Sequence, residues 1–318
     1  MNTAPSTVAP AGALAPSTRD RRIDSPRSLI ASWGLLVGHI AALVFGLGGL
    51  LIALPNPELW SGSELGLKTF DFGMKYGGSL HIVFGAAAVF ALGVLAVGWW
   101  RTVIFFVCAV GLSLASELIG TGTGWPFGNY EYTSYLGYKV LDRVPFTIPL
   151  SWFYMGLSSY LLGRALASML GTRVGPFGRS SVAIGLGVWF LVVWDMVLDP
   201  AMAHADLAVM FWVWHQSGPY FGMPVQNYLG WAATGALFMM VSRLLWRCDP
   251  DPRRYPAVLP AIIYAANIVF ASALSLSVSL WQPIALTLTL IAAPVVLLLL
   301  NRNDAPGEAR TVWLAGDR

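Results

Sequence analysis

Long apolar stretches alternate with short polar segments along most of the chain. A helix needs about 20 mainly apolar residues to cross a bilayer, and each stretch is close to that length. The pattern therefore predicts eight transmembrane helices, with Trp281–Pro283 as the turn between the last two. The predicted spans are residues 29–54, 77–98, 102–119, 146–168, 180–198, 227–246, 257–280 and 283–300.

Composition supports a membrane protein. Charged residues make up 11% of the chain, against roughly 25% in an average soluble protein. Hydrophobic residues reach 56% and the mean hydropathy is +0.64. We therefore expect an all-α polytopic integral membrane protein with one transmembrane domain over residues 29–300. A disordered cytosolic tail would precede it at 1–28, and a second cytosolic tail would follow at 301–318.

The basic residues predict an orientation. With the N-terminus in the cytosol and alternating loops, fifteen of the 19 Lys and Arg residues fall on the cytosolic side. Because cytoplasmic loops carry an excess of these residues, both termini are expected to be cytoplasmic, in the cell (inner) membrane. The basic residues form no cluster, so the net charge of +3 does not indicate nucleic acid. The expected surroundings are the lipid bilayer.

Aromatic residues concentrate in two segments on the predicted outer side. Residues 120–154 hold ten aromatic rings and residues 199–231 hold seven, out of 41 in the chain. Rings of this kind also form belts at the membrane interface. Their gathering in two loops, with Pro and Gly between them, favours ordered loops that line a cavity, since irregular backbone at membrane depth must face protein or water.

Three carboxyl groups are expected close to these loops. Glu117 and Asp195 lie inside predicted spans, and Asp199 ends one. Carboxyl groups at membrane depth are expensive and usually functional. Asp195 and Asp199 are four residues apart and share a helix face, and all three should approach the outer leaflet. The alternative is that they cap helices or bind Lys139 and Arg143 in the adjoining loop.

The histidines and a glycine-rich segment exclude other functions. His39, His81, His204 and His215 do not cluster, whereas a di-iron hydroxylase needs many imidazoles; no metal site is predicted. His39 and His81 are more typical of hydrogen-bonded packing residues, while His204 and His215 could relay protons. The segment Gly120–Gly124 lacks the lysine of a phosphate-binding loop; we expect flexible backbone that folds over a ligand.

Two motifs resemble a known family. Residues 117–130 read ELIGTGTGWPFGNY and are followed by IPLSW at 148–152. Residues 194–200 read WDMVLDP and are followed by WVW at 212–214 and GPYFGMP at 218–224. Together they resemble the CruF-type carotenoid biosynthesis membrane proteins, over about residues 77–300 in layout.

The resemblance implies a carotenoid 1,2-hydratase, or 1′,2′-hydratase in the γ-carotene series, a hydro-lyase without a metal or organic cofactor. Such enzymes add water to the terminal double bond of an acyclic ψ-end group and give a tertiary 1-hydroxy carotenoid. Lycopene, γ-carotene and bisanhydrobacterioruberin are substrates that the resemblance suggests. It does not assign catalytic residues.

The chemistry of hydration fits the carboxyl groups independently. Protonation of the alkene gives a tertiary carbocation, which aromatic faces stabilise, and a second carboxylate can orient water. We hypothesise Asp195 or Glu117 as the acid and Asp199 as the water-orienting partner, with Asn227 as a polar positioner. The predicted substrate-binding set is Phe127, Tyr130, Trp152, Trp212, Trp214, Tyr220, Asn227 and Trp231.

Three alternatives stay open at this point. A carotenoid cyclase also begins by protonating the ψ-end, and only the shape of the cavity decides whether water or an internal alkene captures the cation. A non-catalytic carotenoid-binding subunit would need the aromatic cavity without buried acids. A transporter would share midplane carboxylates, although no convincing inverted repeat is visible.

Overall fold

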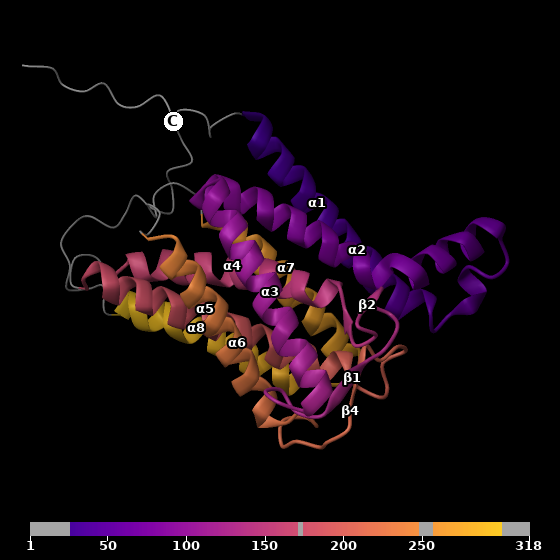
Figure 1. Cartoon of the computed structure of the whole chain (residues 1–318). Helices are drawn as coiled ribbons and strands as arrows, with labels where there is room; N and C mark the ends of the chain where they lie inside the picture. The colour runs from indigo at the N-terminus through magenta and orange to yellow at the C-terminus, as the bar shows by residue number, and fades with distance from the viewer. Residues whose placement is uncertain (1–25, 171–173, 248–256, 301–318) are drawn as a thin grey trace, which may run out of the picture.

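The structure, a computed structural model, describes residues 26–170, 174–247 and 257–300. Within these ranges eight long α-helices form one bundle (Figure 1). The tails expected at 1–28 and 301–318 lie outside the described residues, except that 26–28 begin the first helix. The helices are α1 (Pro26–Gly48), α2 (Glu64–Val97), α3 (Trp99–Thr123), α4 (Thr147–Ser168), α5 (Pro176–Met202), α6 (Val225–Leu245), α7 (Val258–Ser277) and α8 (Trp281–Leu300).

Helix α4 is the centre of the bundle. It contacts α2, α3, α5, α6 and α7, and nineteen of its 22 residues are buried. The other seven long helices in the described residues are apolar enough to cross a membrane, and α4 falls below that standard. Because neighbouring helices shield α4 from lipid, its surface does not have to be apolar. The fold is the all-α polytopic membrane protein that the sequence predicts.

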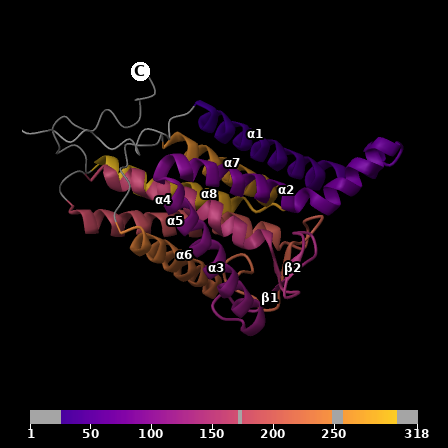
Figure 2. The same ribbon diagram turned by 45° about the horizontal axis from the view of Figure 1, so that its top comes forward.

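Helix α2 is longer than its apolar stretch. It begins at Glu64, not at residue 77, because the Ser63 hydroxyl accepts a hydrogen bond from the Gly66 N–H and caps the first turn. A contact of 2.5 Å between Lys68 and Glu64 supports this polar turn. A π-helical turn η1 (Gly49–Ala53) and a 3₁₀ turn η2 (Pro57–Leu59) connect α1 to α2. This connection projects beyond the bundle (Figures 1 and 2).

Two further boundary predictions were wrong. Residues 120–123, expected as flexible loop, are the last turn of α3, and Gly124 ends the helix in the left-handed region with φ 78°. The turn expected at Trp281–Pro283 is the first turn of α8, where a proline needs no N–H partner. The chain turns between α7 and α8 at residues 278–280 instead.

The two aromatic segments form a small sheet together. Strand β1 (Tyr130–Tyr132) pairs antiparallel with β4 (Trp212–Trp214), in the register Tyr130 opposite Trp214 and Tyr132 opposite Trp212. A second pair, β2 (Lys139–Val140) with β3 (Val144–Pro145), lies in the first aromatic segment. These four short strands sit at one end of the helix bundle (Figure 1).

Candidate functional site

The site lies where α3 and α5 end and α4 and α6 begin. Glu117 is six residues before the end of α3, and Asp195 is seven residues before the end of α5. At 1.5 Å per residue, both carboxyl groups lie roughly 10 Å inside the helix ends. Glu117, Asp195 and Asp199 are each only 2% exposed.

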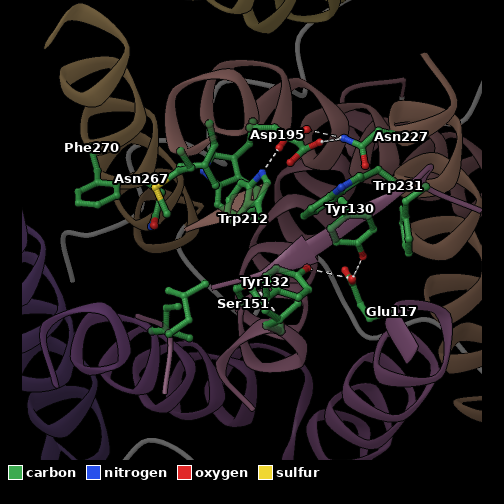
Figure 3. A pocket seen from close by; sticks show the side chains of 18 of the residues that line it. Glu117, Tyr130, Tyr132, Ser151, Asp195, Trp212, Asn227, Trp231, Asn267 and Phe270 are labelled. Carbon is green, nitrogen blue, oxygen red and sulfur yellow. Dashed lines mark hydrogen bonds between the residues drawn. The ribbon is translucent and has the colours of Figure 1, made fainter. Parts of the chain in front are cut away.

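All three carboxyl groups line one cavity of about 70 Å³ (Figure 3). Its aromatic walls come from both loop segments, from α5 and α7, and from the start of α6. Of the predicted substrate-binding residues, those that line it are Phe127, Tyr130, Trp212, Trp214, Asn227 and Trp231. A water molecule in a liquid takes up about 30 Å³, so the cavity has room for a few waters.

Glu117 accepts three hydrogen bonds. The hydroxyl groups of Tyr130 and Tyr132 both donate to Oε2, the latter at 2.9 Å. The indole N–H of Trp152 donates to Oε1 at 2.9 Å. Burial and the adjacent Glu117 raise the pKa of Tyr130 and of Tyr132 well above its ordinary value, so both hydroxyl groups keep their protons. Three groups that can donate to its two oxygens fit a carboxylate at Glu117.

Asp195 and Asp199 share one donor. The side-chain amide nitrogen of Asn227 donates to Asp195 Oδ2 at 3.1 Å and to Asp199 Oδ2 at 2.7 Å. Trp212 Nε1 donates to Asp199 Oδ1 at 2.5 Å. Within the described ranges, no Lys or Arg pairs with these acids or with Glu117. Two negative charges this close repel in a buried site, so the Asp195–Asp199 pair is expected to hold one shared proton.

The β1–β4 sheet directs its rings inward. Side chains alternate between the faces of a strand, so Tyr130 and Tyr132 point to Glu117 while Glu131 is exposed. On the outer side, His215 Nε2 is 3.6 Å from Glu131 Oε1. His204 Nδ1 is 3.8 Å from Asp206 Oδ2. Neither histidine lines the carboxyl cavity.

Two predicted substrate-binding residues, Trp152 and Tyr220, lie outside the cavity lining and contact its neighbours. Trp152 is fully buried, outside the cavity lining, and stacks on Trp231 with ring centroids 3.8 Å apart. The Tyr220 hydroxyl donates to the carbonyl of Met196 at 3.1 Å, and Tyr220 also lies outside the lining. Burial, followed by the charge of Asp195, raises the pKa of Tyr220 to about 12.

Phe127 is wedged between two glycines on different helices. A Cβ at Gly120 of α3 or at Gly230 of α6 would lie 2.7 Å from the ring of Phe127. Real Cβ atoms do not approach so closely, so both positions require glycine for this packing. Gly120 therefore serves close packing against the loop, and not flexibility.

Several lining residues were missed by sequence reasoning. The polar and aromatic ones are His81, Ser151, Tyr154, Trp194, Tyr132, Asn267 and Phe270, and Met202 was missed as well. Tyr132 had a signal, because it alternates with Tyr130 in a short strand. Asn267 and Phe270 come from α7, which carries no aromatic loop and no acidic residue. The buried indole N–H of Trp194 has no hydrogen-bond partner among the described residues.

His39 is a hydrogen-bonded packing residue, as its isolated position predicted. Its Nδ1 lies 2.8 Å from the carbonyl of His81, and its Nε2 lies 3.0 Å from the amide nitrogen of Asn267. The Tyr154 hydroxyl donates to the amide oxygen of Asn267 at 2.9 Å. This buried network ties α1 to α2, α4 and α7 at the cavity wall, which His81, Tyr154 and Asn267 also line.

Fold and site together define a polytopic membrane protein with buried acids around a small aromatic cavity at one end of its helices. The family model described as carotenoid biosynthesis protein matches residues 77–294, more than half of the chain. The chain therefore belongs to this family. The matched range includes all three carboxyl groups.

A relative gives a more particular likeness. The chain is 33% identical over 135 residues to a bisanhydrobacterioruberin hydratase of Haloarcula japonica. That match covers 42% of this chain and 42% of the relative's length. No solved structure matches the chain.

Proposed function

We propose that the protein is a carotenoid hydratase that adds water across the terminal C1–C2 double bond of an acyclic ψ-end group, as in lycopene or γ-carotene. The product is a tertiary 1-hydroxy carotenoid. Membership of the carotenoid biosynthesis family supports the substrate class, and the name of the Haloarcula relative supports the reaction. The site contributes an acid, aromatic faces and room for water.

The contact of Asn227 with two acids is the main structural support for this proposal. The Asn227 amide donates to Asp195 and Asp199 together, and a buried carboxyl pair with one proton is a proton donor and a proton acceptor in one place. Asp195 accepts one hydrogen bond, at 3.1 Å, whereas Asp199 accepts a second from Trp212. We assign the shared proton to Asp195, because Asp199 is better stabilised as the anion.

The reaction then runs in two steps. The π electrons of the terminal double bond take the proton of Asp195, so a C2–H bond forms and a tertiary cation is left at C1. The oxygen of a cavity water attacks C1, and the oxonium ion gives one proton to the Asp199 carboxylate. Transfer of that proton between the paired acids restores Asp195. The sum is one alkene and one water converted to one alcohol.

The walls of the cavity stabilise the cation. Glu117, held as a carboxylate by three donors, supplies a negative charge. The faces of Trp212, Trp214, Tyr130 and Trp231 contribute ~0.5–2 kcal/mol each when desolvated. Trp152 is a positioning residue, because it donates a hydrogen bond to Glu117 and stacks on Trp231.

Expression in a lycopene-accumulating host, with pigment analysis by chromatography and mass spectrometry, tests the function. A product heavier by one water, with its chromophore intact, is the expected result. A product of unchanged mass with an altered chromophore would mean cyclisation. Unchanged lycopene and unchanged γ-carotene, in membranes that contain the folded protein, would contradict hydration and favour carotenoid binding or transport.

We further propose that the protein lies in the cell (inner) membrane with both termini in the cytoplasm, which puts the carboxyl cavity near the outer leaflet. The excess of Lys and Arg in alternate loops supports this orientation. A green fluorescent protein fused after Arg318 should fluoresce, since it folds in the cytoplasm. An alkaline phosphatase fused there should stay inactive; the reverse pair of results would invert the topology.

A further inference from the structure

A second and larger cavity adjoins the carboxyl cavity. Its volume is about 480 Å³, within the range of roughly 300–1,000 Å³ of small-molecule pockets. It lies between the projecting α1–α2 connection and the outer loops, and its walls include Phe45, Leu50, Phe70, Met74 and Phe211. Figure 2 shows the connection extending past the bundle on this side.

The walls of this cavity suit an apolar ligand. None of the described residues that line it carries a charged side chain. Two of its polar groups are used within the protein, since Trp60 Nε1 donates to the Ala53 carbonyl at 2.8 Å and the Ser63 hydroxyl caps α2. Trp60 also stacks on Phe70 with ring centroids 3.7 Å apart. A ligand in this cavity would contact mainly carbon atoms. Polar groups on the ligand would lose their water without gaining a hydrogen bond, so an apolar ligand is favoured.

The two cavities share part of their walls. His81, Met202 and Phe270 line both. The ring of His81 packs beside that of Phe270, with centroids 5.3 Å apart. These three side chains separate the apolar cavity from the acids, and they come from α2, α5 and α7.

Size then distinguishes the roles of the two cavities. The carboxyl cavity, about 70 Å³, has room for water and a few carbon atoms, so the long chain of a carotenoid must leave it. At the edge of the larger cavity, Leu65 is 77% exposed and Phe45 is 37% exposed, so apolar surface leads into it from outside the protein. A chain can therefore enter from the membrane and reach the acids without crossing water.

We propose that the larger cavity binds the polyene chain of the carotenoid, while its end group passes between His81, Met202 and Phe270 to reach the acids. This inference rests on the proposed substrate class. It makes the α1–α2 connection part of the substrate site.

Gly77→Leu tests the inference. Gly77 lines the larger cavity, and a Cβ there meets nothing within 4 Å, so the new side chain occupies the ligand space without a backbone clash. The matched control is Gly185→Leu, on α5, where a Cβ also meets nothing and the residue is exposed outside both cavities. Met74→Trp fills the same space from a second position, in case Gly77→Leu fails to fold.

The proteins are expressed in the lycopene-accumulating host, purified as full chains, and assayed for bound pigment and hydrated product. Because the added side chains fill space that the polyene would occupy, Gly77→Leu and Met74→Trp should each lower both quantities about tenfold or more. Gly185→Leu should keep both. Pigment and product at wild-type levels in the folded cavity variants would overturn the inference, as would wild-type protein that carries only phospholipid in this cavity.

The same experiment distinguishes a failure of this inference from a failure of the proposed function. If the wild-type protein binds lycopene but forms no hydrated product, and Gly77→Leu loses the pigment, the polyene site stands and the hydratase does not. If product forms in Gly77→Leu as in the wild type, the hydratase stands and the polyene site does not.

Discussion

Tyr132 and Trp212 face each other across the β1–β4 sheet and donate to different acids. The Tyr132 hydroxyl donates to Glu117 at 2.9 Å, and the Trp212 indole donates to Asp199 at 2.5 Å. The sheet joins segments that are far apart in the sequence, and thereby links an acid on α3 to the acid pair on α5. The relative positions of these acids therefore depend on the pairing of two three-residue strands.

Removal of the Tyr132 hydroxyl should weaken catalysis more than folding. A hydrogen bond to a charged group contributes about 1.5–3 kcal/mol, so Tyr132→Phe should lower the hydration rate by roughly tenfold or more. Tyr138→Phe is the control, since Tyr138 is 75% exposed. The rate is measured as hydrated pigment per amount of purified protein. Equal rates in the two variants would contradict a role for the hydroxyl.

The paired acids should each be needed. Asp195→Asn removes the proton donor and Asp199→Asn removes the acceptor, so each should lower hydration by about 10²–10⁴-fold. Glu117→Gln should also slow the reaction, because the negative charge beside the cation is lost. Asp142→Asn, in the exposed turn between β2 and β3, controls for expression and handling. Full hydration activity in all three site variants would rule out a carboxyl mechanism.

The contact of Phe127 with its two glycines predicts a stability effect. Gly120→Ala and Gly230→Ala each force a Cβ to 2.7 Å from the Phe127 ring and should destabilise the protein by about 1–3 kcal/mol. Gly111→Ala, also on α3 but with nothing near its Cβ, should be tolerated. Thermal unfolding in detergent measures the difference. Addition of Phe127→Leu should recover part of the loss in Gly230→Ala, as expected for residues in contact.

The buried amide of Asn267 should matter for folding. Asn267→Leu leaves His39 Nε2 and the Tyr154 hydroxyl without their partner, and each unsatisfied buried group costs about 1–3 kcal/mol. We expect a lower unfolding temperature than in Ser277→Leu, a polar-to-apolar change in the last turn of the same helix, where Ser277 is exposed. An unfolding temperature equal to that of the control would show that the network contributes nothing.

The sequence predicts the fold well where the thickness of the bilayer determines the length of a helix. Bilayer thickness imposes a length on apolar segments, and the eight predicted spans correspond to the eight helices. The start of α2 was missed because its first turns, from Glu64, leave the apolar pattern and are held by a cap and an ion pair. The end of α3 was missed because Gly120 and Gly122 suggested loop, whereas their role is close packing with Phe127 and Arg143.

The site was predictable only in part. Acids at membrane depth stand out in a sequence, and Glu117, Asp195 and Asp199 do converge. Their hydrogen bonds did not stand out, since the Tyr130–Trp214 register is a non-local pairing with no sequence signal. Nor could the shared wall be foreseen, because His81 and Phe270 are single residues in the middle of unremarkable spans.

The enclosed position of α4 has a consequence for the making of the protein. A helix of modest hydropathy gains little from hydrocarbon alone, so residues 147–168 cannot rely on lipid to keep them in the bilayer when they leave the ribosome. We expect their stable insertion to require α5, with which α4 packs most extensively, and then α6 and α7. Because α5 also carries Asp195 and Asp199 and α6 carries Asn227, we expect stable insertion of the central helix and assembly of the carboxyl cavity to occur together.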